Sequence, residues 1–234
     1  MTAIPLAIIG LGKMGRAVEA LAPERGFAVV ARLTKSDAIT RQSLDGATVA
    51  IEFTEPSSAP ANARACIEAG CPVVVGTTGW YAELPAVRDE ARRRGGALLT
   101  APNFSLGVAV FSHLVAEAAR RFAALPGFDA HLVEIHHAAK KDAPSGTAVV
   151  LADVASRARG APVPITSVRT GSVPGTHELL FDAQFEQVRL IHEARDRRVF
   201  AEGALAAARW IIGRQGIFTM EDLVTTSHPS TPEQ

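Results

Sequence analysis

Residues 4–15 read Ile-Pro-Leu-Ala-Ile-Ile-Gly-Leu-Gly-Lys-Met-Gly, and this stretch decides the fold of the amino-terminal half. The apolar run Ile4 to Ile9 is typical of a buried strand, and glycines follow it with the G-x-G-x-x-G spacing. Apolar residues then continue at helical spacing as far as Leu21. Such glycines permit a tight turn and close approach of a pyrophosphate to the helix amides, although a plain glycine turn is the alternative. We therefore predict a dinucleotide site with cofactor contacts at Gly10, Gly12, Lys13, Met14 and Gly15.

The expected second strand, Phe27 to Leu33, ends where dinucleotide-binding folds discriminate between cofactors. An acidic residue there would bind the ribose hydroxyls of NAD(H), and none is present. Arg32 and Lys35 would instead meet a 2′-phosphate, so we expect NADPH to be used at least as well as NADH. Asp37 follows slightly later, and a solvated loop is the competing explanation of this charged segment.

Strands and helices alternate as far as Ala101, which predicts a parallel, doubly wound sheet of Rossmann type. Ligands bind such sheets at the carboxyl ends of the strands, so the turn Gly76-Thr-Thr-Gly79 is expected on the nicotinamide side of the cofactor. The arginines of the next helix are interpreted as a solvated face, because no aromatic residues interleave them. We expect strands at Thr48–Phe53, Pro72–Val75 and Ala97–Ala101, and helices at Asn62–Ala69 and Leu84–Arg94.

The densest polar chemistry lies in Glu134-Ile-His-His-Ala-Ala-Lys-Lys-Asp-Ala-Pro-Ser-Gly-Thr147. The segment Ala130 to His137 has the apolar and β-branched residues of a strand, in which Glu134 and His136 share one face and His137 takes the other. The two histidines therefore have different roles. A strand histidine is more often structural than catalytic, so the functional interpretation depends on the neighbouring residues.

A helix is expected to begin near Gly146, with Ser145 as its N-cap. The Gly146 and Thr147 amides and the Thr147 hydroxyl would form a seat for an anion at the positive end of the helix dipole. With Lys140 nearby as a point charge, the stretch predicts a receptor for a carboxylate or phosphate, and a histidine placed to move a proton. A simple helix cap is the structural alternative.

The character of the chain changes after Gly160. Residues alternate over Thr166–Thr170, His177–Ala183 and Gln187–Glu193 as they would in antiparallel strands, which predicts a second, α+β domain. Its largely antiparallel or mixed sheet would be open on one face, and such a face commonly builds an oligomer interface. An apolar helix is expected at Phe200–Ile212, a short element at Met220–Val224 and a frayed tail at Thr225–Gln234.

Composition excludes several classes of protein. The 234 residues are 47% hydrophobic, and 24 basic side chains balance 24 acidic ones, so no global field favours nucleic acid or an anionic membrane. No leader pattern opens the chain and no apolar run approaches the roughly 20 residues of a membrane span, so we expect a cytoplasmic protein. Cys66 and Cys71 have apolar neighbours and are expected as buried, reduced thiols, with no metal site.

The pattern Glu-x-His-His-x-x-Lys-x-Asp-x-Pro-Ser-Gly-Thr-Ala, from Glu134 to Ala148, resembles the signature of the bacterial dihydrodipicolinate reductase (4-hydroxy-tetrahydrodipicolinate reductase) family. The segments Phe53–Pro56, Gly76–Gly79, Ala101–Ser105 and Phe200–Trp210 resemble further blocks of that family, so the likeness covers nearly the whole chain. Two departures leave cofactor affinity and preference open: the chain is shorter between its second and third strands, and Ile9 replaces a glycine of some members.

This resemblance implies an NAD(P)H-dependent reduction of 4-hydroxy-tetrahydrodipicolinate to tetrahydrodipicolinate, in the diaminopimelate pathway of lysine biosynthesis, by a homotetramer. It also implies a dinucleotide-binding domain over 1–103 and 199–234, and a substrate-binding and oligomerisation domain over 104–198. Residue roles carry over by matching position. They are proton donation by His136 and Lys140, binding of substrate carboxylates by His137, Gly146 and Thr147, and nicotinamide contacts by Gly76, Thr77, Thr78, Ala101, Pro102, Asn103 and Phe104.

Two other functions remain open from the residues. The first is a different two-domain nicotinamide enzyme, such as an amino-acid or sugar dehydrogenase, which leaves the Ser-Gly-Thr signature without an account. The second is a non-catalytic dinucleotide sensor that tolerates loss of His136 and Lys140. Binding of a doubly charged substrate would also suggest hinge closure, with joints near Asn103–Gly107 and near Arg198.

Overall fold

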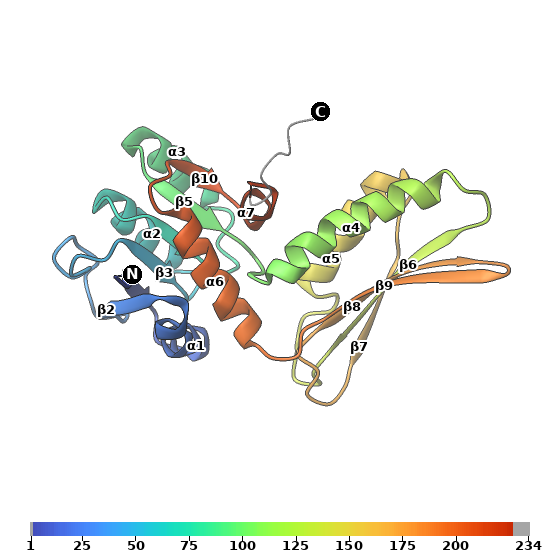
Figure 1. Ribbon diagram of the computed structural model, residues 1–234, viewed down its shortest axis with the longest axis horizontal. Helices are drawn as coiled ribbons and strands as arrows, with labels where there is room; N and C mark the ends of the chain where they lie inside the picture. Colours follow the sequence, from blue (N-terminus) through green and yellow to red (C-terminus); the bar gives the residue numbers. More distant parts are fainter. Residues whose placement is uncertain (1, 227–234) are drawn as a thin grey trace. The chain divides into compact units, whose positions relative to one another are not determined.

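The chain packs as two compact units (Figure 1). A computed structural model describes residues 2–226, so the tail expected at Thr225–Gln234 lies, from residue 227 onward, outside the described residues. The first unit joins the chain up to Leu106 with the segment that begins at Phe200, and the second unit is Gly107–Val199.

The first unit is built on a parallel sheet of six strands in the order β10-β5-β4-β3-β1-β2. Its strands are β1 (Ile4–Ile9), β2 (Phe27–Leu33), β3 (Val49–Glu52), β4 (Val73–Val75), β5 (Ala97–Thr100) and β10 (Gly216–Phe218). Its helical elements are α1 (Lys13–Leu21), η1 (Pro23–Arg25), α2 (Ala59–Glu68), α3 (Leu84–Arg94), α6 (Arg198–Ile211) and α7 (Met220–Thr226). The predicted parallel, doubly wound sheet is confirmed. Strand β10, which is too short to give a pattern, was not predicted.

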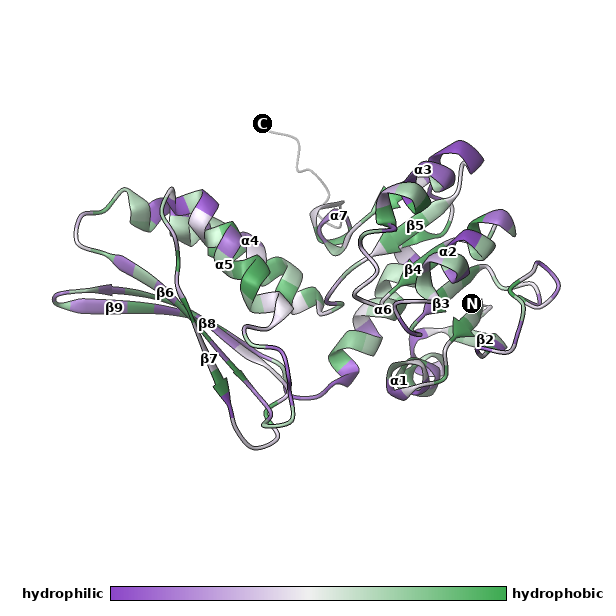
Figure 2. Ribbon diagram, turned by 180° about the vertical axis from the view of Figure 1, so that it is seen from behind, coloured by the Kyte–Doolittle hydropathy of each residue, from purple (hydrophilic) through white to green (hydrophobic). Residues whose placement is uncertain are grey.

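Helices cover both faces of this sheet, and its central strands β3, β4 and β5 are apolar except at their last residues, Glu52 of β3 and Thr100 of β5. Every residue of β3, β4 and β5 is buried, as expected for parallel strands that meet no solvent. Figure 2 shows β4 and β5 in green, whereas the arginine-rich end of α3 is purple, which agrees with the solvated face expected there. Cys66 and Cys71 are both buried thiols in the same core, as predicted.

The second unit holds a four-stranded sheet in the order β7-β6-β8-β9, with α4 (Leu106–Ala123) and α5 (Gly146–Arg159) packed on one face (Figure 1). Its strands are β6 (Asp129–His136), β7 (Ile165–Arg169), β8 (Thr176–Ala183) and β9 (Glu186–Glu193). Strands β6, β8 and β9 pair antiparallel, as predicted, but β7 runs parallel to β6. The predicted largely antiparallel or mixed sheet is confirmed. Only the antiparallel direction expected for β7 was wrong, because α5 serves as a crossover between β6 and β7, and a crossover connects parallel strands.

Residues on the two faces of this sheet differ in character. Leu132, Leu179 and Phe181 are fully buried beneath the helices. On the opposite face Val168 and Ile191 are 36% and 54% exposed. The sheet therefore presents apolar side chains on a face that no described helix covers.

No helix among residues 2–226 is long and apolar enough to cross a membrane.

Candidate active site

The glycine-rich loop lies at the carboxyl end of β1, and the space around its three glycines differs. Gly10 has a φ of 92°, and a Cβ there would overlap the carbonyl oxygen of Phe53. A Cβ at Gly15 would overlap the carbonyl oxygen of Gly10, so α1 packs directly against the loop. Gly12, the N-cap of α1, faces open space and supplies no side-chain cap. This open, uncapped helix start fits a pyrophosphate, which needs close approach to backbone amides.

The turn after β4 is tied to the end of β3. A Cβ at Gly76 would overlap the ring of Phe53, and the hydroxyl of Thr77 accepts a hydrogen bond of 2.7 Å from the amide of Thr54. Beneath this turn the fully buried Glu52 accepts hydrogen bonds from the Thr54 hydroxyl and, at 3.3 Å, from Asn62. Burial raises the pKa of the Glu52 carboxyl. These hydrogen bonds support the carboxyl edge of the parallel sheet, where the cofactor is expected, and they were not predicted.

The segment Ala101–Phe104 follows β5 at the same edge of the sheet. Ala101 and Phe104 are buried, and the Phe104 ring meets the Phe53 ring edge-on with centroids 5.8 Å apart. A Cβ at Gly203 of α6 would overlap the carbonyl oxygen of Phe104. Gly203 thus lets α6 pack tightly against this segment. This contact between two residues far apart in the chain could not be predicted from a local pattern.

Two basic residues expected near the adenosine ribose make ion pairs. Lys35 Nζ lies 2.8 Å from Glu55 Oε1, and Arg32 is paired with Glu19. The pairing with Glu55 raises the pKa of Lys35. Asp37 accepts hydrogen bonds from the amide and hydroxyl of Thr34, which closes the loop after β2. A 2′-phosphate at Lys35 would therefore compete with the Glu55 carboxylate.

In the second unit, Glu134 and His136 share the helix-covered face of β6, as the strand alternation predicted. Glu134 is fully buried, and its carboxylate accepts hydrogen bonds from His136 Nδ1, Arg169 Nη2 at 2.6 Å and the Ser145 amide at 3.2 Å. Burial by itself raises the pKa of Glu134, but these donors and the Ser167 side chain outweigh it and lower the pKa to about 2. Burial also lowers the pKa of His136, against the opposing effect of Glu134.

His137 and Lys140 lie where β6 has ended and the chain turns toward α5. His137 Nε2 lies 3.0 Å from Arg197 Nη2. The amide of Lys140 donates to the carbonyl of His137 at 3.0 Å, which forms a turn, and Lys140 Nζ lies 2.8 Å from Asp142 Oδ1. Arg197 thus lies against His137, and the backbone of the turn brings Lys140 close to His137 in the chain, so two cationic side chains accompany this histidine.

Helix α5 begins at Gly146, and Ser145 caps it by accepting a 3.1 Å hydrogen bond from the Ala148 amide, as predicted. A Cβ at Gly146 would meet no atom within 4 Å, so the helix start is open at this residue. The Ser145 hydroxyl also lies 3.3 Å from Nε2 of the buried His177. Burial, with His136 and His192 adding to the effect, lowers the pKa of His177 to about 4. His177 is therefore neutral at physiological pH.

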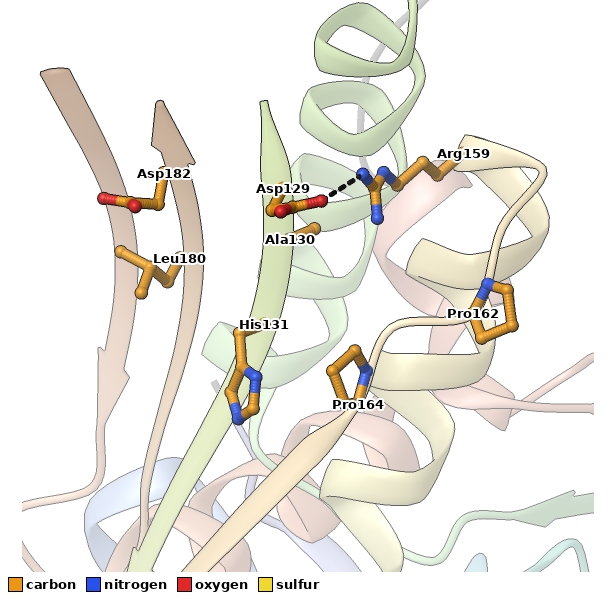
Figure 3. A pocket seen from close by; sticks show the side chains of 8 residues that line it. All are labelled: Asp129, Ala130, His131, Arg159, Pro162, Pro164, Leu180 and Asp182. Atoms are coloured by element: carbon orange, nitrogen blue, oxygen red, sulfur yellow. Dashed lines mark hydrogen bonds and ion pairs between the residues drawn. The ribbon is translucent and has the colours of Figure 1, made fainter. Parts of the chain in front are cut away.

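A cavity of about 280 Å³ in the second unit lies away from these groups (Figure 3). It opens at the Asp129 end of β6, whereas His136 is at the opposite end of that strand. Figure 3 shows Asp129 paired with Arg159 above His131 and Pro164. The ion pair at this cavity joins Arg159 to the almost fully exposed side chain of Asp129, so the cavity lacks the buried carboxylate and histidine of the β6–α5 junction.

The expected site residues therefore form two sets, and the members of each set lie together in one unit. The glycine loop, the Gly76–Thr78 turn and the Ala101–Phe104 segment gather at the carboxyl edge of the parallel sheet. His136, His137, Lys140, Gly146 and Thr147 lie at the junction of β6 with α5. Sequence reasoning missed the partners that hold the second set, namely Ser167, Arg169, His177 and Arg197, because they come from strands and loops distant in sequence. Among residues 2–226 no cluster of side chains suits a metal ion.

A Rossmann-type parallel sheet, followed by a unit that brings a carboxylate-bound histidine together with a lysine and an open helix start, is typical of pyridine-nucleotide-dependent oxidoreductases. Comparison with known proteins narrows this class. The dihydrodipicolinate reductase N-terminus model matches residues 4–104, and the C-terminus model of the same family matches residues 107–224. The chain belongs to the dihydrodipicolinate reductase family, and the resemblance seen in the sequence is confirmed.

Individual relatives agree with this assignment. The 4-hydroxy-tetrahydrodipicolinate reductase of Christiangramia forsetii is 34% identical, with 94% of this chain and 97% of the relative covered. The enzyme of the same name from Xanthomonas campestris pv. campestris is 38% identical, with 96% of this chain and all of the relative covered.

Solved structures show the fold alone. The dipicolinate-bound dihydrodipicolinate reductase from Paenisporosarcina sp. TG-14 has a TM-score of 0.80 at 22% identity, covering 94% of this chain and 99% of that one. An inositol dehydrogenase homologue from Azotobacter vinelandii has a TM-score of 0.53 at 15% identity, covering 97% of this chain and 88% of that one. This inositol dehydrogenase homologue therefore shares the architecture, whereas the family models match this chain to the dihydrodipicolinate reductases.

Proposed function

We infer that this oxidoreductase uses NAD(P)H and a proton to reduce 4-hydroxy-tetrahydrodipicolinate to tetrahydrodipicolinate, with the 4-hydroxyl group leaving as water, in the diaminopimelate pathway of lysine biosynthesis. Family membership supports the reaction. The observation that carries it in the structure is the junction of β6 with α5, where His136 is held by a buried carboxylate beside Lys140 and an open helix start.

The first unit would bind the cofactor. Gly10, Gly12, Lys13, Met14 and Gly15 hold the pyrophosphate at the start of α1, and Gly76, Thr77, Thr78, Ala101, Pro102, Asn103 and Phe104 contact the nicotinamide end. When bound, NAD(P)H supplies the hydride. The strain that a side chain would cause at Gly10 and Gly76, set beside the open space at Gly12, supports this assignment.

The second unit would bind and protonate the substrate. His137, Gly146 and Thr147 bind the substrate carboxylates, and Arg197, 3.0 Å from His137, adds a guanidinium to the same receptor. His136 and Lys140 supply the proton that completes the reduction. The Asp142 carboxylate restrains Lys140 Nζ until the substrate arrives.

We further propose that NADPH is used at least as well as NADH. No acidic residue ends β2, and Lys35 stands beside the expected position of the ribose. The ion pair with Glu55 opposes this preference by offering Lys35 a competing anion, so the difference between the two cofactors should be small.

The uncovered face of the four-stranded sheet would join protomers into a homotetramer in the cytoplasm, where Cys66 and Cys71 stay reduced. The exposed Val168 and Ile191 support such an interface. Light scattering on a size-exclusion column should give the tetramer mass, and Ile191→Asp should give a smaller species. A wild-type monomer at micromolar concentration would contradict the assembly.

The reaction is tested by the loss of absorbance at 340 nm when the protein and NADPH, then NADH, meet fresh condensation product of pyruvate and aspartate semialdehyde. Rapid oxidation is expected with both cofactors. Cofactor binding without oxidation would overturn the proposed substrate, and oxidation by a sugar or amino acid in parallel assays would identify the class that replaces it.

A further inference from the structure

Glu134 lies on β6, an inner strand between β7 and β8, and its buried carboxylate makes more hydrogen bonds than a purely structural residue there needs. It accepts hydrogen bonds from His136 of its own strand, from Arg169 of β7 and from the backbone amide of Ser145, which is the cap of α5. Its side chain is fully buried, and such a charge is retained only where donors satisfy it.

Contact with Glu134 fixes which nitrogen of His136 can react. Because an ionised carboxylate only accepts hydrogen bonds, His136 Nδ1 must carry the hydrogen that lies between them. The other nitrogen, Nε2, is then the one that takes up and releases a proton. A Cβ at Gly175 would lie 3.0 Å from this Nε2, so the absence of a side chain at 175 keeps space beside it.

Arg169 connects this pair to the turn that carries Lys140. Its Nη2 atom donates to Glu134 Oε1 and to the carbonyl of Asp142, each at 2.6 Å. Asp142 in turn binds Lys140 Nζ. One guanidinium therefore links the carboxylate behind His136 to the residue that restrains the second proposed proton donor.

We propose that Glu134 is the positioning residue of His136: it fixes the tautomer with Nδ1–H and directs Nε2 toward the substrate, while Arg169 holds the carboxylate in place. This inference deepens the proposed function and rests on the assignment of His136 as a proton donor. Glu134 does not touch substrate or cofactor in this account and acts through the imidazole alone.

The charges around His136 determine how loss of Glu134 would be observed. Glu134 on β6 favours the imidazolium, whereas Lys140 in the turn and Arg169 on β7 disfavour it. His177 on β8 meets the imidazole edge-on as a neutral ring, and the Asp142 carboxylate is engaged with Lys140. Removing the Glu134 carboxylate takes away the group that stabilises the imidazolium and leaves the two cations that oppose it. His136 should then lose its proton at lower pH, and the rate should fall off at lower pH as well.

The test compares Glu134→Gln with His136→Gln and with a control, Asp129→Asn. Asp129 lies on the same strand and also pairs with an arginine, Arg159, but stands at the far end from His136. Glu134→Gln should lower kcat about tenfold or more, move the alkaline fall of kcat to lower pH, and leave NADPH affinity and substrate KM nearly unchanged. Asp129→Asn should leave kcat and its pH profile as in the wild type.

The outcomes separate this inference from the function on which it rests. Full activity in His136→Gln would overturn the role of His136 itself. Loss of activity in His136→Gln, together with a wild-type rate and pH profile in Glu134→Gln, would overturn the positioning role of Glu134 alone.

A measurement on the wild-type protein keeps the inference testable if Glu134→Gln fails to fold. Nitrogen-15 NMR of labelled histidine distinguishes the two neutral tautomers, and His136 can be assigned by the signal missing from His136→Gln. The Nδ1–H form is expected at neutral and mildly alkaline pH. A neutral His136 with its hydrogen on Nε2 would overturn the proposal.

Discussion

Two strand–turn–helix junctions, β1 to α1 and β6 to α5, carry the proposed cofactor and substrate sites, and their helix starts are built by different means. The first depends on backbone: Gly12 gives α1 no side-chain cap, and Gly10 and Gly15 exclude any side chain. The second depends on side chains: Ser145 caps α5, and His136, His137 and Lys140 surround the turn before it.

This difference follows from what each junction must do. A pyrophosphate needs only amides and close approach, which glycine provides without adding titratable groups. Proton transfer needs an ionisable side chain in one tautomer and one position, which buried partners must hold. Steric changes should therefore be most damaging at the first junction, and changes of charge or protonation at the second.

The largest effect is expected from Gly10→Ala. Its φ of 92° and the overlap of a Cβ with the Phe53 carbonyl should distort the loop, at a cost of about 1–3 kcal/mol or more. NADPH binding, measured by calorimetry, should weaken at least about 100-fold. Gly46→Ala, at a positive φ but with open space around it, is the control and should retain NADPH affinity. Near-normal affinity in Gly10→Ala would remove the steric basis of the comparison.

The second effect in size is that of Lys140→Ala. Loss of this proposed proton donor should lower turnover about 100-fold, while the melting temperature stays near that of the wild type because the side chain lies at the surface turn. Lys141→Ala, one residue along the chain, is the matched control and should keep its turnover. Wild-type turnover in Lys140→Ala as well as in Lys141→Ala would show that the charge of Lys140 is not used in the reaction.

His177 in the second unit should make the free energy of unfolding depend on pH. Its pKa is about 4 in the folded state against 6.5 for an unperturbed histidine, so the unfolded chain binds the proton first as pH falls. Stability from His177 is therefore full above pH 6.5 and should decline by about 3 kcal/mol as pH falls through this window to about 4. Denaturant titrations of wild type and His177→Gln should show a smaller decline in the variant, and equal declines would contradict this role.

The smallest effects should come from the exposed pair Lys35 and Glu55. Lys35→Ala should lower the ratio of kcat/KM for NADPH over NADH, and Glu55→Gln should raise it, each by roughly two- to fivefold because the pair is solvated. Both effects should shrink at high salt. A change in the same direction for both variants would mean that the pair does not face the 2′-phosphate.

The two junctions were not equally predictable from the sequence. The glycine loop depends on residues adjacent in the chain, so the pattern from Ile4 to Gly15 predicted its strand, turn and helix. The second junction was predicted as far as its local order goes, including the shared face of Glu134 and His136 and the Ser145 cap. Its partners Arg169 and His177 could not be foreseen, because they reach the site only through strand pairing with β6.

The same reasoning explains why β7 was predicted as a strand but with the wrong direction. The alternation in β7 identifies a strand with one exposed face but does not specify its direction, which the α5 crossover determines. Likewise, Gly203 and Glu52 support the cofactor edge from a distant helix and from beneath a turn, and neither carries a local signal for that role.

The most direct test of the central claim, that the β6–α5 junction carries the proton-transfer chemistry, is the turnover of His136→Gln. With NADPH and fresh substrate, kcat should fall about 100-fold or more while NADPH affinity is retained. His131→Gln, a second histidine on the same strand, should keep its turnover, since His131 lies with Thr166 at the end away from the junction. Full activity in His136→Gln would contradict the account and move the proton donor elsewhere.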